Sequence, residues 1–347
     1  MIFIPHNCEN LIQHIFHTAI HTPELHHHAM KKRTVIITGA TSGIGKTAAH
    51  RFAAEGHNVI MACRNLEKAG IVKQEIIDVS GNDQVTAIKL DVSSSESVAS
   101  FCNTFRQQYP KLDVLIHNAA YFDHGASYKL SRDNLELTFA TNVFGPFLMT
   151  HQLRDSLRKS DDARILHAGS NIIKHFFNPK LHIGFDNLQG EHPESASFKV
   201  YNSYRDSKMA LLMLTFRMAR EFEPDGIRVN MLQINGATMS EETLQRVTPG
   251  YRLVARTQNL FFRPPEFMAE HYLAICTSDQ FRNVTGQLIN HRREPMQPGV
   301  ENPGPLEQIR QAVGADRYPR YALDKEEADN VWELCNRLGS THLRFPG

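Results

Sequence analysis

The sequence contains few cysteines and a single tryptophan. Five cysteines are scattered at positions 8, 63, 102, 276 and 335 of a 347-residue chain. None of them forms a C-x-x-C pair, which argues against a zinc site, and their density is far below that of a disulfide scaffold. We therefore expect reduced thiols in a cytosol-like compartment and predict a cytoplasmic protein.

An excess of charge of either sign is also missing. The chain carries 38 Lys+Arg and 37 Asp+Glu, a formal net charge of +1, and no long basic run. A nucleic-acid binder usually concentrates positive charge on one face, so nucleic acid is not an expected partner. The 41% hydrophobic content is enough to fill a sizeable core, which predicts an ordinary globular fold.

No hydrophobic run is long enough to span a bilayer. The apolar helical face near residues 11–20 is interrupted by histidines and is much shorter than the ~20 residues that a membrane span needs. No basic region precedes it, so a secretory signal is not expected either. The tract His26 to His28 offers metal ligands, but we interpret it as incidental. We treat residues 1–30 as an N-terminal extension, and whether Met30 is the true start stays open.

Strand-like and helix-like segments alternate from Lys31 onward, a pattern typical of a parallel sheet covered on both faces. The expected strands are 33–38, 58–63, 85–90, 114–116, 164–168 and 227–234, and the first expected helix is 44–54. The sequence thus predicts an α/β fold, a Rossmann-type doubly wound sheet in a single domain over 31–290.

The last part of the chain, residues 291–347, is expected to be a loop and a helix packed on the same domain. Its first half, 292–321, is rich in Pro and Gly, and we expect an irregular excursion there. A final helix is predicted to begin near Asp324, because Asp324 and Glu327 have the spacing of a capping box.

The first chemical motif is T-G-A-T-S-G-I-G over residues 38–45, at the turn between the first strand and the first helix. Glycines at this turn let the backbone approach a pyrophosphate, which the helix N-terminus stabilises. The candidate cofactor-binding residues here are Gly39, Thr41, Ser42, Gly43, Ile44 and Gly45. Because the spacing differs from that of a phosphate-binding P-loop, despite the following Lys46, ATP is disfavoured.

Four later segments occur in a familiar order: L-D-V at 90–92, H-N-A-A at 117–120, Asn142 within T-N-V-F-G, and Y-R-D-S-K at 204–208. With the glycine turn they make the chain resemble the short-chain dehydrogenase/reductase family over roughly residues 31–240. The stretch 185–190, with its N-L-Q-G, and A-C-R-N at 62–65 are similar to the retinol dehydrogenase-like and WW-domain oxidoreductase-like branch. Y-R-D-S-K also resembles protochlorophyllide reductase.

The resemblance implies cofactor contacts and an assembly. It places Asp91 and Val92 beside the adenine, and Asn118, Ala119 and Ala120 along the ribose side, where they also stabilise the central sheet. It further implies a homodimer or a homotetramer.

The catalytic hypothesis rests on Tyr204 and Lys208, four residues apart and so on one helical face. A tyrosine with its ordinary pKa near ~10 exchanges protons poorly at neutral pH, and a nearby ammonium favours the phenolate. We therefore expect Lys208, together with the positive charge of the oxidised nicotinamide, to lower the pKa of Tyr204. The resemblance implies that Lys208 also holds the nicotinamide ribose. It makes Ser170 the third catalytic residue, polarising the substrate carbonyl. Asn142 is expected to hold a water that connects Lys208 to solvent, or alternatively to cap backbone groups at a helix kink.

The choice of dinucleotide is predicted from the end of the second strand. An NAD site usually has a carboxylate there for the ribose 2'-hydroxyl, whereas this chain has Arg64. A guanidinium suits a 2'-phosphate, and Lys46 is expected to add charge nearby. We therefore predict a preference for NADP(H), with NAD(H) disfavoured.

One departure from the family pattern affects the nicotinamide end. Asn235 stands where the family commonly has proline, so the turn loses its fixed φ, and Thr238 is a candidate contact to the carboxamide. Two functions stay open: an NADP(H)-dependent dehydrogenase or reductase that acts on a hydrophobic carbonyl or alcohol, and a catalytically silent dinucleotide-binding regulator. The intact Ser170, Tyr204 and Lys208 favour the enzyme.

Overall fold

The computed structural model describes residues 31–123, 127–184, 199–236 and 262–342, with the single positions 238, 245, 252, 256, 257 and 259. The chain divides into two units, 1–32 and 33–347, and every labelled element lies in the second. The expected N-terminal extension with its histidine tract lies outside the described residues, as does the N-L-Q-G stretch.

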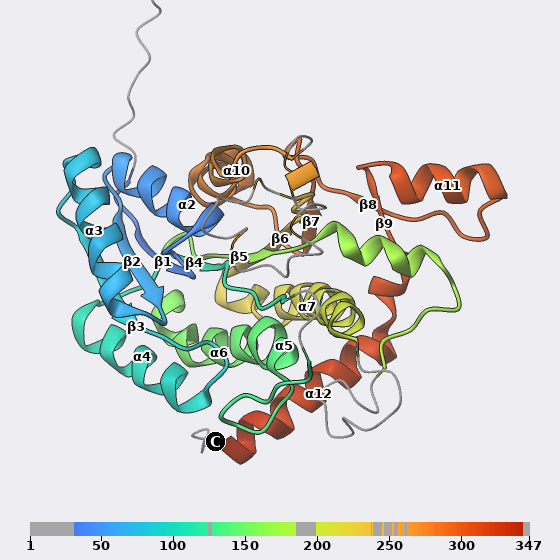
Figure 1. Cartoon of the computed structure of the whole chain (residues 1–347), viewed down its shortest axis with the longest axis horizontal. Coiled ribbons are helices and arrows are strands. Elements are labelled where there is room, and N and C mark those ends of the chain that lie inside the picture. The colour runs from blue at the N-terminus through green and yellow to red at the C-terminus, as the bar shows by residue number, and fades with distance from the viewer. Residues whose placement is uncertain are drawn as a thin grey trace, which may run out of the picture. The chain divides into compact units, whose positions relative to one another are not determined.

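The core of the second unit is a sheet of seven parallel strands in the order β3-β2-β1-β4-β5-β6-β7 (Figure 1). The strands are β1 (Thr34–Thr38), β2 (Asn58–Cys63), β3 (Val85–Lys89), β4 (Val114–His117), β5 (Arg164–Ala168), β6 (Arg228–Leu232) and β7 (Gln287–Ile289). The strand order reverses between β1 and β4, where open α/β sheets usually bind their ligands. The predicted Rossmann-type sheet is confirmed.

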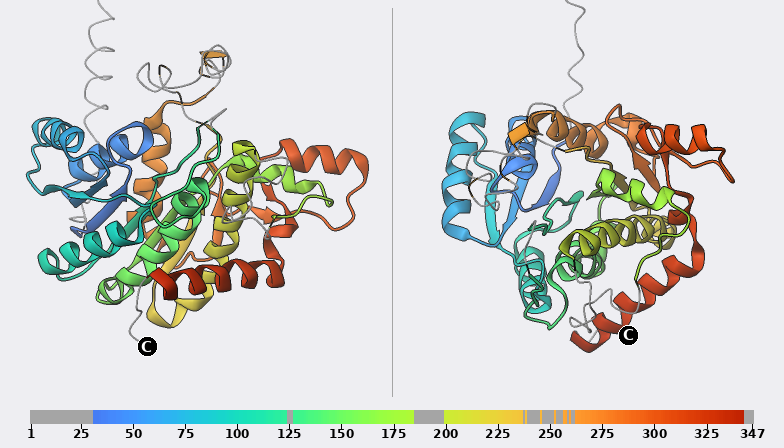
Figure 2. Two further views of the ribbon diagram at one scale, coloured as in Figure 1. Left: turned by 60° about the horizontal axis from the view of Figure 1, so that its bottom comes forward. Right: turned by 45° about the vertical axis from the view of Figure 1, so that its right-hand side comes forward.

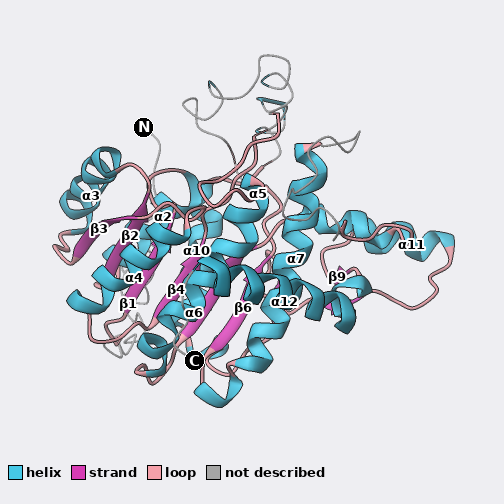
Figure 3. Cartoon of the chain, turned by 90° about the horizontal axis from the view of Figure 1, so that it is seen from below, coloured by secondary structure: helices cyan, strands magenta, loops and turns pink. Residues whose placement is uncertain are grey.

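Helices cover both faces of this sheet, which explains why its strands are apolar on both sides. In β1, Ile36 packs into one hydrophobic core, while Val35 and Ile37 pack into the other, and all three are fully buried. One face is covered by α2 (Gly43–Ala54), α3 (Leu66–Ser80) and α10 (Pro265–Thr277). The other is covered by α4 (Ser95–Gln108), α6 (Gly145–Arg158), α7 (Val200–Glu221) and α12 (Lys325–His342). Figure 3 shows the strands between these helices.

Short helical segments connect the main elements. They are α5 (Leu137–Phe139), η1 (Ala140–Phe144), η2 (Asn171–Phe177), η4 (Glu223–Asp225), η5 (Asp279–Phe281) and η6 (Arg320–Leu323). The first two lead directly into α6, and η2 follows β5, so both connections leave the sheet near the carboxyl ends of its strands.

The expectation of an irregular excursion over residues 292–321 was wrong. This stretch contains β8 (Gln297–Pro298), α11 (Pro305–Val313) and β9 (Arg317–Tyr318), and β8 and β9 pair in parallel. Pro305 starts α11 and Gly314 follows its last residue, and these are favourable positions for the two residue types at the ends of a helix. Figure 2 shows α11 at the edge of the unit.

The predicted C-terminal helix is confirmed. The backbone N–H of Glu327 donates to the Asp324 carboxylate over 3.2 Å, so Asp324 caps α12. The helix packs on α7 and α6. Its Trp332 meets Phe147 of α6 edge to face, with 5.2 Å between ring centroids, and the guanidinium of Arg217 on α7 lies 5.3 Å from the Trp332 ring.

Two further observations concern the described part of the chain. None of the helices found there combines the length and the apolar character that a bilayer crossing requires. The cysteines at 63, 102, 276 and 335 are free and buried.

Candidate active site

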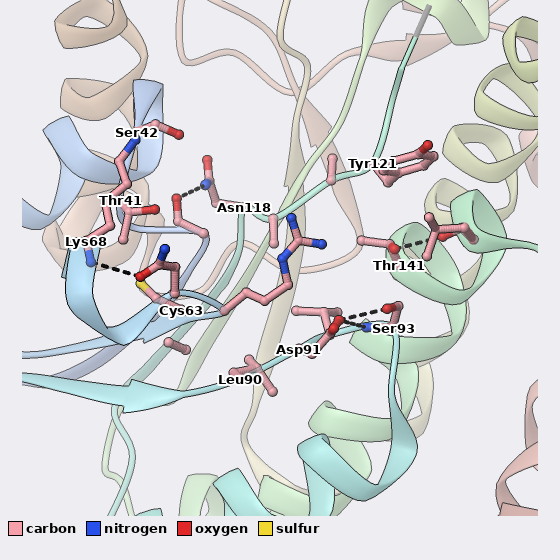
Figure 4. Close-up of a pocket in the computed structure, with 18 residues that line it drawn as sticks. Thr41, Ser42, Cys63, Lys68, Leu90, Asp91, Ser93, Asn118, Tyr121 and Thr141 are labelled. Carbon is pink, nitrogen blue, oxygen red and sulfur yellow. Dashed lines mark hydrogen bonds between the residues drawn. The ribbon is translucent and has the colours of Figure 1, made fainter. Parts of the chain in front are cut away.

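Loops at the carboxyl ends of β1, β2, β3 and β4 surround a pocket of about 670 Å³. Figure 4 shows Thr41 and Ser42 after β1, Cys63 at the end of β2, and Asp91 and Asn118 after β3 and β4, gathered around one space. Five other predicted cofactor residues also line the pocket: Gly39, Arg64, Val92, Ala119 and Ala120. Tyr121, which was not predicted, lines it as well. The structure therefore brings the predicted cofactor motifs together.

The glycine turn fits a dinucleotide phosphate group sterically. Gly39 has a φ of +68°, which L side chains rarely adopt. A Cβ on Gly45 would meet the side-chain amide of Asn118 and the carbonyl of Gly39, so only glycine allows this close packing. The side chain of Ser42, the N-cap residue of α2, makes no capping hydrogen bond. Ser42 lines the pocket, and the first N–H groups of α2 beside it have no side-chain cap, so they are free of a competing side chain where a pyrophosphate would bind.

Hydrogen bonds join the glycine turn to the end of β4. The Thr38 hydroxyl accepts from the backbone N–H groups of Asn118 and Ala119 at 3.0 and 2.9 Å. The Asn118 side-chain amide donates to the carbonyl of Thr38 at 3.0 Å. These bonds fix the end of β1 against the end of β4, where the strand order reverses. This agrees with the sheet-stabilising role expected for Asn118.

Basic residues lie at the end of β2, where the 2'-phosphate is predicted to bind, but they are not the expected pair of Arg64 and Lys46. Arg64 is exposed and lines the pocket, together with Asn65 and Lys68 at the start of α3. The Lys89 ammonium donates to the backbone carbonyl of Arg64 at 2.6 Å. The expected contribution of Lys46 was wrong: its ammonium pairs with Glu75 of α3 at 2.7 Å, and Lys46 does not line the pocket. Position 46 points toward the neighbouring helix because α2 packs beside α3.

A second cavity, of about 540 Å³, contains the predicted catalytic residues. Ser170, Tyr204 and Lys208 all line it, and it shares Asn118 and Ala120 with the first pocket. The two cavities therefore adjoin along the sheet edge.

Tyr204 and Ser170 form a hydrogen-bonded pair. Burial raises the pKa of the Tyr204 hydroxyl, and the hydrogen bond with Ser170 lowers it in part. Ser170 also caps η2, because its hydroxyl accepts from the Ile172 N–H at 3.3 Å. The serine side chain is thereby held at the end of β5 with its oxygen beside the phenol.

Lys208 lies one turn beyond Tyr204 on α7 and is almost completely buried. Its ammonium donates to the carbonyl of Ala168 at 2.9 Å and lies 5.7 Å from the centroid of the Tyr204 ring. Burial lowers the pKa of Lys208 to about 8. The active-site helix therefore keeps a titratable amine within the cavity, as the spacing of the two residues predicts.

Lys208 alone does not bring the pKa of Tyr204 below its ordinary value, so the expected lowering by Lys208 and an oxidised nicotinamide together stays a prediction. The net shift of the Tyr204 pKa is upward, because removing the phenolate from water costs more free energy than the Ser170 hydrogen bond returns. The Lys208 ammonium is directed to Ala168. A phenolate at Tyr204 thus requires additional positive charge in the cavity.

Asn142 lies in a π-helical turn and lines neither cavity. Its side chain accepts from the Tyr121 N–H at 2.8 Å and donates to the Tyr121 carbonyl and the Ser207 hydroxyl, both at 3.1 Å. This is the backbone-capping alternative, and it joins a pocket-lining residue to the catalytic helix. Pro146 has no N–H that could donate to the carbonyl of Asn142, so the regular α-helical hydrogen bond is missing at this turn. Single π-helical turns of this kind are frequent at functional sites.

The turn that has Asn235 in place of proline is held by a side-chain contact. The Asn235 amide donates to Nδ1 of His291, 3.1 Å away in the loop after β7. Asn235 and Gly236 line the second cavity. Thr238 does not line either cavity, and its backbone N–H donates to the Arg263 carbonyl at 3.0 Å.

Several lining residues were missed by the sequence analysis. In the first pocket these include Asn65, Lys68 and Thr141, and in the second Asn171 and Phe262. Asn65 and Lys68 follow Arg64 directly at the start of a helix, so a search for helix N-caps after the second strand would have found them. Phe262 comes from a distant segment and carries no local signal.

Comparisons with known proteins agree with this geometry. Residues 33–177 match the family model described as short chain dehydrogenase. Human retinol dehydrogenase 11 is 36% identical over 257 residues, which cover 73% of this chain and 76% of the relative. The chicken (Gallus gallus) WW domain-containing oxidoreductase is 29% identical over 75% of this chain and 61% of the relative.

A solved short-chain dehydrogenase of Escherichia coli CFT073, complexed with NADPH, has the same fold. The TM-score is 0.59 at 23% identity, and the match covers 76% of this chain and 98% of the other. With the parallel sheet, the glycine turn and the ordered motifs already described, these similarities lead to one conclusion. The chain belongs to the short-chain dehydrogenase/reductase family and is similar to its retinol dehydrogenase-like branch.

Proposed function

We propose that the protein is an NADP(H)-dependent oxidoreductase that interconverts a hydrophobic alcohol and its carbonyl compound. The observation that carries this proposal is the convergence of Ser170, Tyr204 and Lys208 in a cavity that adjoins the dinucleotide-shaped pocket. A silent regulator needs the pocket but has no use for a buried lysine beside a half-buried phenol, and burying the lysine costs stability.

The side chains have distinct roles in the reduction direction. When bound, the reduced nicotinamide supplies a hydride to the carbonyl carbon. The Ser170 hydroxyl donates a hydrogen bond to the carbonyl oxygen, and the Tyr204 hydroxyl transfers its proton to the same oxygen as negative charge develops there. The product is an alcohol, and Tyr204 is left as a phenolate until it is reprotonated. Lys208 stabilises that phenolate, and its buried ammonium is the cation nearest to the ring among the interactions described.

Aromatic side chains support the assignment of an apolar substrate. The Phe122 ring lies against the Tyr204 ring, with 4.5 Å between centroids, and keeps 38% of its surface exposed. Phe262 lines the catalytic cavity. The named relatives include retinol dehydrogenases, and retinol is a long apolar alcohol, so we include retinoid-like alcohols and aldehydes in the proposed substrate class.

The direct test is a substrate screen that follows NADPH absorbance. Purified protein is incubated with NADPH and a series of carbonyl compounds from short polar to long apolar, and the reverse reaction is followed with NADP+ and the matching alcohols. We expect turnover to rise with the apolar length of the substrate. Binding of NADPH without turnover of any carbonyl or alcohol would support the regulator instead.

Replacing Arg64 with alanine is expected to change cofactor choice. Arg64 lines the dinucleotide pocket, and we expect its guanidinium to pair with the 2'-phosphate, a charge-assisted contact worth ~1.5–3 kcal/mol. We therefore expect Arg64→Ala to weaken NADPH binding by roughly one to two decades at ~1.4 kcal/mol per decade. NADH lacks the phosphate, so its affinity should stay almost unchanged. Fluorescence titration of both cofactors measures the difference.

A suitable control is Arg310→Ala, which removes an exposed arginine of α11 distant from the pocket lining. It should leave both affinities at the wild-type value. Equal weakening of NADPH and NADH by Arg64→Ala would mean that Arg64 supports the loop structure, and the NADP(H) preference would lose its main support. Lys68 lines the same pocket. If its ammonium also contacts the 2'-phosphate, the loss of NADPH affinity in Arg64→Ala should be nearer to one decade than to two.

A further inference from the structure

A buried tyrosine of α10 contacts Asn118, a residue that lines the candidate cofactor site. Tyr272 is fully buried, and its hydroxyl donates to the side-chain oxygen of Asn118 at 3.1 Å. Asn118 lines both cavities, whereas Tyr272 lines neither. The tyrosine therefore acts on the site only through its neighbour.

The carbonyls of Thr38 and Gly39 and the Tyr272 hydroxyl together fix how the Asn118 amide lies: the carbonyls select the face of its nitrogen, and the hydroxyl holds its oxygen. With its oxygen held by Tyr272, the amide nitrogen faces the carbonyls of Thr38 and Gly39, at 3.0 and 3.4 Å. A flipped amide would set its oxygen against those two carbonyl oxygens, which is repulsive, and would set its NH2 group toward the tyrosine hydroxyl. Only one orientation satisfies all the polar atoms.

The orientation of Asn118 in turn sets the shape of the glycine turn. The amide nitrogen lies against Gly45, close enough that a Cβ there would collide with it. Asn118 thus spaces the first turn of α2 from the end of β4. A shift of this amide moves the N–H groups that are placed to receive the pyrophosphate.

Helix packing fixes the position of Tyr272. The helices α10 and α2 are in extensive contact, and Tyr272 shares its hydrophobic core with Ala48, Ala49 and Phe52 of α2. The two alanines let the helices approach closely. An ion pair at the rim, between Arg51 and Glu270 at 2.5 Å, holds the same two helices together.

We infer that Tyr272 is a positioning residue of the dinucleotide site, which it organises through Asn118. This inference rests on the proposed function, because it assigns a role within that cofactor site. Tyr272→Phe removes one oxygen atom and keeps the ring that fills the core, so the fold should be retained. We expect the Kd for NADPH to rise about threefold to tenfold, the effect of losing one buried hydrogen bond. The KM for NADPH should rise with it, while kcat at saturating cofactor stays within about twofold.

The matched control is Tyr109→Phe. The Tyr109 hydroxyl donates to Thr86 at 3.0 Å, between the end of α4 and β3, so this variant loses a similar bond outside the cofactor cavities. Its Kd for NADPH should equal that of wild type. A second measurement, hydrogen exchange of residues 38–45 without cofactor, should show faster exchange in Tyr272→Phe and wild-type exchange in Tyr109→Phe.

A double-mutant cycle separates positioning from general packing. In an Asn118→Ala background Tyr272 has no amide to hold, so Tyr272→Phe should change the Kd by less than twofold. The inference is overturned if Tyr272→Phe binds NADPH as wild type does, or if it weakens binding equally in both backgrounds. Failure of the proposed function has a different signature, because wild-type protein would then turn over no carbonyl or alcohol whether or not it bound NADPH, whereas the Kd and hydrogen-exchange comparisons do not depend on turnover.

Discussion

Tyr204→Phe should lower turnover by about 10²–10⁴-fold, the usual contribution of a positioned general acid. The substitution removes the proton that the proposed reaction transfers and keeps the ring packed against Phe122. NADPH binding should persist, because the glycine turn and Arg64 are untouched. Single-turnover absorbance measurements with saturating NADPH, together with fluorescence titration of the cofactor, test both statements.

Tyr201 provides the matched control on the same helix. It lies one turn before Tyr204, is 42% exposed, and its hydroxyl is 2.7 Å from Nε2 of His175. Tyr201→Phe should therefore keep turnover within a few-fold of wild type. Near-normal turnover in Tyr204→Phe would mean that another group donates the proton, and a collapse in Tyr201→Phe would move that role one turn along α7.

Lys208→Met should abolish most turnover and make the protein more stable. The proposed function has the ammonium stabilise the Tyr204 phenolate, and the family resemblance implies that it also holds the nicotinamide ribose, so both turnover and cofactor affinity should fall. Loss of turnover with unchanged affinity would contradict the ribose-binding role. Methionine fills the same buried space without a charge.

The stability gain has a defined pH dependence. Burial lowers the pKa of Lys208 from 10.5 to about 8, and at ~1.4 kcal/mol per pKa unit the charged lysine costs up to ~3 kcal/mol. Below pH 8 the lysine is protonated in both folded and unfolded protein, so this cost is fully present. Between pH 8 and 10.5 the folded protein binds fewer protons than the unfolded protein, so wild-type stability rises relative to the variant.

We therefore expect the free energy of unfolding of Lys208→Met to exceed that of wild type by ~1–3 kcal/mol at pH 7, after loss of the Ala168 hydrogen bond, with a smaller difference at pH 9.5. Urea unfolding of both proteins at the two pH values measures it. Lys325→Met, at an exposed position that begins α12, should show neither the gain nor the pH dependence. A difference that is constant with pH would show that hydrophobic packing, and not the charge, is responsible.

Local sequence patterns predicted most of the sheet because its strands are short, apolar and separated by helices. The bounds of β2 and β5 agree with the prediction to the residue. The last strand, β7, was missed because only three residues form it, and a run this short has no periodicity. In the C-terminal region the Pro and Gly content concealed α11, since the same two residue types that break helices also start and end them.

The site residues could be predicted where their motif is contiguous in sequence. The prediction failed where the packing of distant elements decides which way a side chain points. The glycine turn was recognised from its spacing and its place after the first strand, and the Tyr204–Lys208 pair from its spacing together with the motifs that precede it. The direction of Lys46 depends on which helix packs beside α2, and the sequence of α2 does not contain that information. For the same reason Tyr272 looked like any apolar core position, because its partner Asn118 is 154 residues away in the chain.

The packing of α12 has a consequence for self-association. In this chain the outward surface of α6 and α7 is occupied by the chain's own last helix, through Trp332 and the contacts of Phe147 and Arg217. A second copy that approached those two helices would meet α12 first and would have to displace a helix whose Val331 and Cys335 are completely buried. We therefore expect any dimer or tetramer to assemble through α12 itself or through another surface, and we expect truncation before Lys325 to expose the apolar side chains that pack against Val331 and Cys335.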